Sequence, residues 1–168
     1  MIDTQHAYVC LGSNLGDRAG NLLLAVRGML DAGLVVTRLS SIYETEPVEV
    51  TDAQGSYLNM VAQVSLAGSP PAPEQLLARL LRVEHALGRR RERLRAARTI
   101  DLDLLLYGDA LSDTPFLRLP HPRLAARRFV LAPLAELAPG AEHPVIGQTF
   151  RRLLDAAPAG AGVRPWRP

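Results

Sequence analysis

Arginine and aspartate side chains concentrate in one segment of the chain, residues 88–103 (GRRRERLRAARTIDLD). Six arginines lie within ten residues. Asp101 and Asp103 follow them, and one residue separates the two aspartates. Guanidinium groups bind phosphate oxygens through two parallel hydrogen bonds, and carboxylates are common protein ligands of Mg²⁺. Side chains of these two kinds, adjacent in one segment, are what a metal-assisted reaction on a polyphosphate requires.

The two aspartates begin a leucine-rich segment, residues 99–107 (TIDLDLLLY), that predicts a largely buried strand. Residues i and i+2 of a strand point to the same face, roughly 6.5 to 7 Å apart at about 3.3 Å per residue, so both carboxylates could bind one ligand. An Asp-x-Asp pair is most often two exposed carboxylates. Unpaired carboxylates at the mouth of a buried strand, however, are costly without a cation, and the flanking leucines therefore favour a metal site.

The arginines outnumber the aspartates that they could neutralise. They follow a glycine that ends a predicted helix, in a segment without helical or strand periodicity, so we expect a mobile loop that carries guanidinium groups to phosphate. An arginine run is also typical of a solvated surface or a nucleic-acid patch, and that description fits two or three of the six. The six residues are Arg89, Arg90, Arg91, Arg93, Arg95 and Arg98.

Length and composition predict one catalytic domain that spans residues 1–168, with a loosely held Gly- and Pro-rich tail at 158–168. The net charge is only +2 although the pI is about 9.1, so basic character is local. Cys10 is the only cysteine, which excludes an internal disulfide and agrees with a reducing compartment. Because no secretory or membrane-spanning segment is apparent, we expect a cytoplasmic protein without a membrane partner.

Strand and helix signals alternate along the chain. The order strand, helix, strand, strand, helix, strand predicts a ferredoxin-like α+β fold, with an antiparallel sheet and helices packed on its faces. The expected strands are 6–11, 34–43, 57–66 and 99–107, and the expected helices are 18–30, 73–87, 129–137 and 149–156. A polar loop at 44–55 is long enough to be functional. Neither a P-loop nor a Rossmann glycine motif is present, and the cysteine and histidines lack zinc-ligand spacing.

Four segments together resemble the 6-hydroxymethyl-7,8-dihydropterin pyrophosphokinase (HPPK) family. The resemblance extends in the family's order from about Tyr8 to Pro139, and the combination of motifs is highly specific. The segments are YVCLGSNLGDR (8–18), SSIYETEPV (40–48) with GSYLNMV (55–61), RTIDLDLLLYGD (98–109) and LPHPRLAARRFVLAPLAELAP (119–139).

The resemblance implies transfer of a pyrophosphoryl group from ATP to the hydroxymethyl group of 6-hydroxymethyl-7,8-dihydropterin, with release of AMP, in folate biosynthesis. It implies that Asp101 and Asp103 hold two Mg²⁺ ions on ATP, and that Arg89 and Arg98 assist the chemical step. The positions that match the family's ATP site are Glu84, Arg89, Arg91, Arg98, Leu104, Arg118, His121 and Arg127. Those that match its pterin site are Thr45, Pro47, Val48, Tyr57, Asn59 and Phe129, with the two aromatic residues on either side of the ring.

One segment departs from the family's pattern. Members often carry Trp-Gly-Pro-Arg before the D-x-D strand, whereas this chain has Arg95-Ala96-Ala97-Arg98, and its single tryptophan is Trp166. The departure leaves open how Arg95 acts and whether Trp166 packs on the body of the protein.

Two other functional classes remain. A nucleic-acid-binding ferredoxin-like module would use the arginines on phosphates, but it would also need aromatic side chains exposed on its sheet. With three Phe, four Tyr and one Trp, the chain is poor in them. A non-catalytic interaction domain is the third class. We expect a monomer that binds ATP and the pterin alcohol and binds no nucleic acid.

Overall fold

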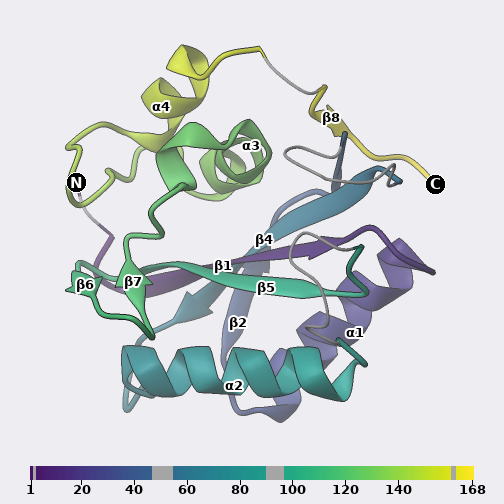
Figure 1. The fold of residues 1–168 in the computed structure, drawn as a ribbon. Helices are drawn as coiled ribbons and strands as arrows, with labels where there is room; N and C mark the ends of the chain where they lie inside the picture. The colour runs from purple at the N-terminus through teal and green to yellow at the C-terminus, as the bar shows by residue number, and fades with distance from the viewer. Residues whose placement is uncertain (2, 47–54, 90–96, 160–161) are drawn as a thin grey trace.

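The computed structural model describes residues 1, 3–46, 55–89, 97–159 and 162–168. Figure 1 shows strands crossing the middle of the molecule, with helices on both sides of them. The strands are β1 (His6–Ser13), β2 (Val36–Leu39), β3 (Tyr43–Thr45), β4 (Tyr57–Ser65), β5 (Asp101–Tyr107), β6 (Ser112–Asp113), β7 (Arg118–Leu119) and β8 (Arg164–Pro165). The α-helices are α1 (Arg18–Asp31), α2 (Pro73–Ala86), α3 (Arg128–Leu137) and α4 (Phe150–Ala156), with a 3₁₀ turn at Leu124–Ala126.

The main sheet has six strands, all paired antiparallel. Its order is β5-β1-β4-β3-β8, and β2 also pairs with β4. The structure thus confirms the predicted α+β class with an antiparallel sheet. Strand β1 lies between β4 and β5, so that residues of three strands far apart in sequence meet in rows across the sheet.

The prediction of one strand at 34–43 is wrong, because β2 and β3 pair with β4 as two separate strands. The break falls at Ser40 and Ser41. The Ser40 hydroxyl, instead of a backbone carbonyl, accepts the Val61 N–H at 2.9 Å. The Ser41 N–H turns to Glu136 Oε1 on α3, also at 2.9 Å. Side-chain acceptors therefore end the ladder where the residues by themselves suggest continuous strand.

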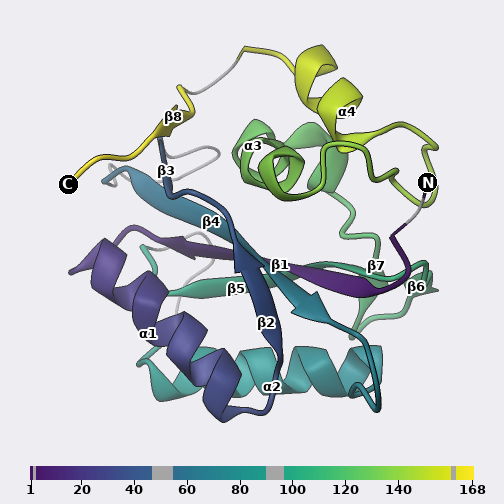
Figure 2. The ribbon, with the colours of Figure 1, turned by 180° about the vertical axis from the view of Figure 1, so that it is seen from behind.

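Side chains of β1 alternate between two hydrophobic cores. Ala7, Val9 and Leu11 join the core beneath α1 and α2, whereas Tyr8 and Cys10 join the core beneath α3 and α4. Figure 2 shows the same two layers from behind, with α1 and α2 on one side of the sheet and α3 and α4 on the other. Because both faces are covered, the central strands β1 and β4 are buried along nearly their whole length instead of alternating between buried and exposed residues.

Helix α2 ends in a way that determines where the arginine segment begins. Gly88 has a φ of +81°, a left-handed conformation that glycine adopts without steric cost. The Arg89 N–H then donates to the Glu84 carbonyl at 3.0 Å. The chain thus turns back at once, and the Arg89 side chain faces Asp101, the first residue of β5.

The tail is paired with the body at residues 164–166, so the expectation of a loosely held tail does not hold there. Strand β8 pairs with β3, and the Trp166 N–H donates to the Ile42 carbonyl at 2.8 Å. The Trp166 side chain is partly buried against the core beneath α1 and α2. Within the described part of the chain, no helix is long and apolar enough to cross a membrane.

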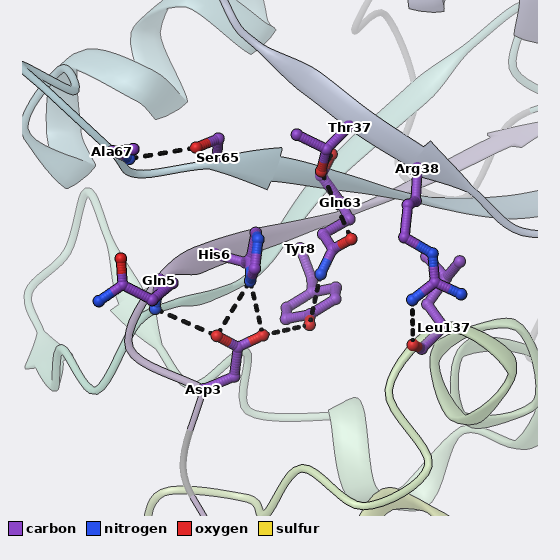
Figure 3. Close-up of polar contacts among 10 residues, drawn as sticks. All are labelled: Asp3, Gln5, His6, Tyr8, Thr37, Arg38, Gln63, Ser65, Ala67 and Leu137. Carbon is purple, nitrogen blue, oxygen red and sulfur yellow. Dashed lines mark hydrogen bonds and ion pairs between the residues drawn. The ribbon is translucent and has the colours of Figure 1, made fainter.

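A hydrogen-bonded network lies at the start of β1 (Figure 3). Asp3 accepts hydrogen bonds from the Gln5 N–H at 3.1 Å and from the Tyr8 hydroxyl at 2.5 Å. His6 Nδ1 also contacts this carboxylate, and Gln63 Nε2 donates to the Tyr8 oxygen at 3.2 Å. The network joins the N-terminal segment to β1 and β4 at the end of the sheet where β1 begins.

Candidate active site

Asp101 and Asp103 lie on the same face of β5, the face that α3 and α4 cover. In the antiparallel pairing, Asp101 lies opposite Gly12 and Asp103 opposite Cys10, which belongs to the core beneath α3 and α4. Burial raises the pKa of Asp103 to about 6, with Asp101 and then Glu84 adding to the effect, against the opposing pull of Arg127 and Arg98. The alternation predicted from the D-x-D spacing is therefore confirmed, and Asp103 is a carboxylate whose negative charge is poorly compensated.

Two arginines meet at Asp101. Arg89 Nη1 lies 2.6 Å from Asp101 Oδ1, and Arg98 Nη1 donates to Asp101 Oδ2. The Arg89 side chain is only 11% exposed, so the expected mobile loop does not begin at this residue. A buried guanidinium between two carboxylates is held in one orientation. The structure thus brings together the two arginines expected to assist catalysis and one of the aspartates expected to bind metal.

Glu84 on α2 holds Arg89 in place from the other side. Its side chain is almost fully buried, and its Oε1 accepts hydrogen bonds from Arg89 Nη1 and, at 2.7 Å, from the Leu102 N–H of β5. Glu84 was expected to line a nucleotide site, and it does line the cavity beside Asp101 and Asp103. Its contacts add a second task, which is to fix Arg89 against β5.

Asn14, a residue to which the sequence assigned no role, orients Arg98. Its Oδ1 accepts the Arg98 N–H at 2.7 Å, and its own N–H donates to the Arg98 carbonyl at 3.1 Å. The side chain is buried directly after β1. A polar residue in the Gly12-Ser13-Asn14 turn was the available signal, but its partner is 84 residues away in the chain and could not be read from spacing.

A cavity of about 520 Å³ opens beside this cluster. Its walls combine the charged cluster with apolar side chains of α2 and of the segment around β7. The residues that line it are Leu77, Leu81, Glu84, Arg89, Arg98, Asp101, Leu102, Asp103, Leu104, Pro115, Phe116, Leu117, Arg118, His121 and Pro122. Six of the expected ATP-site residues therefore line one cavity. Phe116, which the sequence did not suggest, is 54% exposed at its rim.

His121 is neutral at physiological pH in this cavity. Burial lowers its pKa to about 4, and the positive charges of Arg127 and Arg123 lower it further. Its Nδ1 accepts the Arg123 N–H at 3.2 Å. In the neutral ring the other nitrogen, Nε2, then carries the hydrogen, so His121 can act as a hydrogen-bond donor to an anion without bearing a charge.

Asn59 marks a second, less charged part of the site. It is almost fully buried on β4, and its Nδ2 donates to Thr45 Oγ1 on β3 at 2.8 Å. Gly12 lies opposite Asn59 on one side and opposite Asp101 on the other. A Cβ atom on Gly12 would be 2.8 Å from Asn59 Oδ1. The missing side chain therefore keeps space open between the amide and the carboxylate, whose strands are about 9 to 10 Å apart.

One of the two expected aromatic residues comes from the sheet and the other from a helix that covers it. Tyr57 is on β4, two residues before Asn59, and Phe129 is in the first turn of α3; both are partly buried. Arg127 Cζ lies 5.4 Å from the centre of the Phe129 ring. Among the aromatic pairs that the structure describes, Tyr57 and Phe129 are not in ring contact. Their expected position on either side of a pterin therefore stays a prediction.

Three expected site residues, Pro47, Val48 and Arg91, lie outside the described residues, as does Arg95. Arg118 lines the cavity, but its side chain is 63% exposed and pairs with Asp113 at 3.3 Å. No group of three or more His, Cys, Asp or Glu side chains within the described ranges could by itself enclose a metal. Among the described residues, the aspartate pair therefore offers a cation two carboxylates of this kind and no third.

The fold and the site define an α+β protein in which a carboxylate pair, a set of arginines and a buried amide converge on one face of the sheet. Such a combination suits a protein that holds a polyphosphate beside a polar heterocycle. A family model described as 7,8-dihydro-6-hydroxymethylpterin-pyrophosphokinase (HPPK) matches residues 8–139. The chain belongs to this family.

Curated relatives agree with the match. The chain is 40% identical over 162 residues to the 2-amino-4-hydroxy-6-hydroxymethyldihydropteridine pyrophosphokinase of Bacillus subtilis, covering 96% of this chain and 90% of the relative. It is 36% identical over 138 residues to the protein of the same name from Aquifex aeolicus, covering 82% and 83%.

Solved structures share the fold. The Plasmodium falciparum HPPK-DHPS structure with pteroate superimposes with a TM-score of 0.70 at 14% identity. The match covers 92% of this chain and 44% of that one. This chain therefore spans less than half the length of that longer protein, and the likeness concerns the fold.

Proposed function

We propose that this protein transfers the pyrophosphoryl group of ATP to the hydroxymethyl group of 6-hydroxymethyl-7,8-dihydropterin in folate biosynthesis. The hydroxymethyl oxygen forms a bond to the β-phosphorus, the bond from that phosphorus to the oxygen of the α-phosphate breaks, and AMP leaves. One observation carries the proposal. Asn59, Gly12 and Asp101 form a single row across β4, β1 and β5, so the Asn59 amide, proposed to bind the pterin, faces the Asp101 carboxylate, proposed to bind Mg²⁺, over a glycine.

Asp101 and Asp103 are the residues that would hold Mg²⁺, in two ions brought with ATP. The raised pKa of Asp103 supports this, because a buried carboxylate beside a second carboxylate is stabilised by a cation. Two carboxylates completed by substrate phosphate oxygens are an ordinary Mg²⁺ ligand set. When bound, the cations would neutralise charge on the transferred phosphoryl group and on the leaving AMP.

The arginines bind and orient the phosphates. Arg89 and Arg98 both pair with Asp101. The two guanidiniums would donate to phosphate oxygens of ATP, with Arg98 on the transferred group, and Mg²⁺ held by Asp101 would neutralise the carboxylate that they share. Glu84 and Asn14 keep the two arginines nearby. Arg91 is proposed to join them.

The remaining ATP contacts come from the far side of the cavity. Nε2–H of His121 and the guanidiniums of Arg127 and Arg118 would donate to phosphate or ribose oxygens, and Leu104 contributes to the apolar wall. On the pterin side, Asn59 Oδ1 accepts from the ring, and Thr45 orients the amide by accepting from its Nδ2. Tyr57 and Phe129 would contact the two ring faces, and the backbone around Pro47 and Val48 would complete the pocket.

We also propose that the fold is ferredoxin-like. The strand order β5-β1-β4, with β2 and β3 both on β4, supports a ferredoxin-like plan in which β2 and β3 together take the place of one edge strand. A cytoplasmic location, a monomeric state and the absence of a nucleic-acid partner stay predictions.

Incubation with ATP, Mg²⁺ and the dihydropterin alcohol tests the proposal by the identity of the nucleotide released. We expect AMP and a pyrophosphorylated pterin in equal amounts. Release of ADP would exclude attack at the β-phosphorus. Asp101→Ala should abolish AMP release with the fold intact, whereas Asp109→Ala, an exposed aspartate just after the same strand, should retain the wild-type rate.

A further inference from the structure

Glu44 on β3 connects four segments of the chain. Its Oε1 accepts hydrogen bonds from Ser56 Oγ at 2.8 Å and from Arg18 Nη1 at 3.2 Å. Its Oε2 accepts one from Arg164 Nη2, in the tail, at 2.8 Å. Arg18 Nη1 closes the set by donating to the Ser56 carbonyl at 2.9 Å. One carboxylate thus joins β3 to the start of α1, to the residue before β4 and to β8.

This cluster borders the pterin side of the site. Glu44 directly precedes Thr45, whose hydroxyl accepts a hydrogen bond from the Asn59 amide, and Ser56 directly precedes Tyr57. Thr45 and Tyr57 lie opposite each other in the pairing of β3 with β4. Successive residues of a strand point to opposite faces, so Glu44 and Ser56 hold from one face the backbone that presents Thr45 and Tyr57 on the other.

The tail holds β3 from the side opposite β4. Strand β3 has only three residues, and β8 is its other neighbour in the sheet. Arg164 lies opposite Glu44 and Pro165 opposite Tyr43, while the Trp166 N–H donates to the Ile42 carbonyl. Figure 2 shows β8 next to β3. Without the tail, β3 would be a short edge strand that pairs only with β4, and such strands fray readily.

We propose that the C-terminal tail is a positioning element of the pterin site: Arg164 and Trp166 hold β3 through Glu44 and Ile42, so that Thr45 keeps the Asn59 amide in its binding orientation. The inference rests on the proposed function and adds a part of the chain, residues 164–166, that lies outside the family match at 8–139. Among the described residues, the hydrogen bonds and ion pair of residues 164–166 go to β3 and Ile42 and not to the cavity residues around Asp101. The tail therefore affects the binding of the pterin and not the binding of ATP.

The size of the effect follows from the exposure of the contacts. The Arg164 side chain is 68% exposed, and an exposed ion pair alone changes an equilibrium by a factor of about two to five. Removing the indole packing as well should have a larger effect. We expect Arg164→Ala to raise the KM for the dihydropterin about threefold, and Arg164→Ala with Trp166→Ala to raise it about tenfold.

The test compares five proteins under the same conditions: the wild type, Arg164→Ala, Arg164→Lys, the double variant Arg164→Ala/Trp166→Ala, and Arg167→Ala as the matched control. Arg167 is exposed in the same tail and makes no ion pair with any described residue. For each, KM is measured separately for the dihydropterin and for ATP. Hydrogen exchange is followed without ligand on peptides that cover 42–46 and 56–60, and on a peptide from β5 for reference.

Support requires all of the following results together. The double variant must show a raised dihydropterin KM with the ATP KM within about twofold, and faster exchange in β3 with β5 unchanged. Arg167→Ala must behave as the wild type, and Arg164→Lys must recover part of the loss of Arg164→Ala. Unchanged β3 exchange, or equal rises in both KM values, overturns the proposal.

Failure of the proposed function is distinguishable from failure of this inference. A wild-type protein that releases no AMP refutes the transferase activity, whatever the tail does. The exchange measurement needs no substrate and still decides whether the tail orders β3. If the double variant unfolds at the assay temperature, Arg164→Ala alone, which keeps the indole in place, gives the same comparison at smaller amplitude.

Discussion

Two carboxylates beside β1 are in opposite situations: Asp3 precedes the strand, and Asp103 lies on β5 opposite Cys10. Asp3 accepts hydrogen bonds from Gln5 and Tyr8 and contacts His6, and Gln63 extends the network (Figure 3). Burial would raise the pKa of Asp3, but these hydrogen bonds outweigh it and hold the pKa below its usual value. By contrast, the pKa of Asp103 is raised to about 6.

The difference separates a carboxylate that the protein itself stabilises from one whose charge is poorly compensated. The Asp3 carboxylate has its donors inside the protein and needs nothing further. Asp103 lies beside a second carboxylate and makes no hydrogen bond or ion pair with any described residue. A fold that keeps such a group is less stable than it could be, and the usual reason is binding or catalysis. Substitution of Asp103 or of Asp3 tests this difference.

The largest effect is expected from Asp103→Asn on turnover. A metal ligand contributes several kcal/mol to the stabilisation of the transition state, so kcat/KM should fall by about 10³-fold or more. Steady-state AMP release measures this loss, with Asp109→Asn as the control. A variant within tenfold of the wild type would mean that Asp103 is not a metal ligand.

The same substitution should stabilise the protein without ligand. Removing a poorly compensated charge is expected to raise the free energy of unfolding at pH 7 by about 1–3 kcal/mol. Because the folded pKa of Asp103 is raised, its ionisation costs stability as pH increases from about 4 to 6 and beyond. The gain should therefore vanish near pH 3.5 and be complete by pH 7, measured by denaturant unfolding in EDTA. A loss of stability at pH 7 would contradict the comparison.

Asp3→Asn should do the reverse. Loss of a charged acceptor is expected to lower the free energy of unfolding by about 1–2 kcal/mol at pH 7, with kcat and both KM values unchanged. Because the folded pKa of Asp3 is lowered, its contribution is present above the unfolded pKa, near 3.8, and disappears as pH falls through the folded value. The difference between variant and wild type should therefore shrink in acid.

Tyr8→Phe should give the smallest effect, a loss of about 0.5–1.5 kcal/mol, because it removes one hydroxyl and leaves Asp3 its other donors. Burial and the neighbouring Asp3 raise the pKa of Tyr8, so the hydroxyl stays protonated and the loss should not vary with pH between 6 and 9. Thermal unfolding at several pH values checks this. A change in the dihydropterin KM in either Asp3→Asn or Tyr8→Phe would show that Asp3 and the site around Asp103 are coupled.

Local patterns predicted most of the helices and strands, since apolar periodicity is set by neighbours in the chain. The helices predicted at 18–30 and 129–137 agree with α1 and α3 to within a residue. The strand predicted at 34–43 failed because Ser40 and Ser41 form hydrogen bonds with Val61 and Glu136, which are distant in sequence. The D-x-D spacing predicted correctly that Asp101 and Asp103 share a face, because a strand has a period of two.

The sequence by itself determined the kind of chemistry at the site: two carboxylates on one strand face, arginines directly before them, and the motifs of the HPPK family. Only the tertiary structure decided how these groups are held. Asn14 orients Arg98, Gly12 keeps space beside Asn59, and Glu84 fixes Arg89. It also decided that the tail pairs with β3. Contacts between segments far apart in the chain leave no periodic trace, because they depend on strand order and register, which only packing determines.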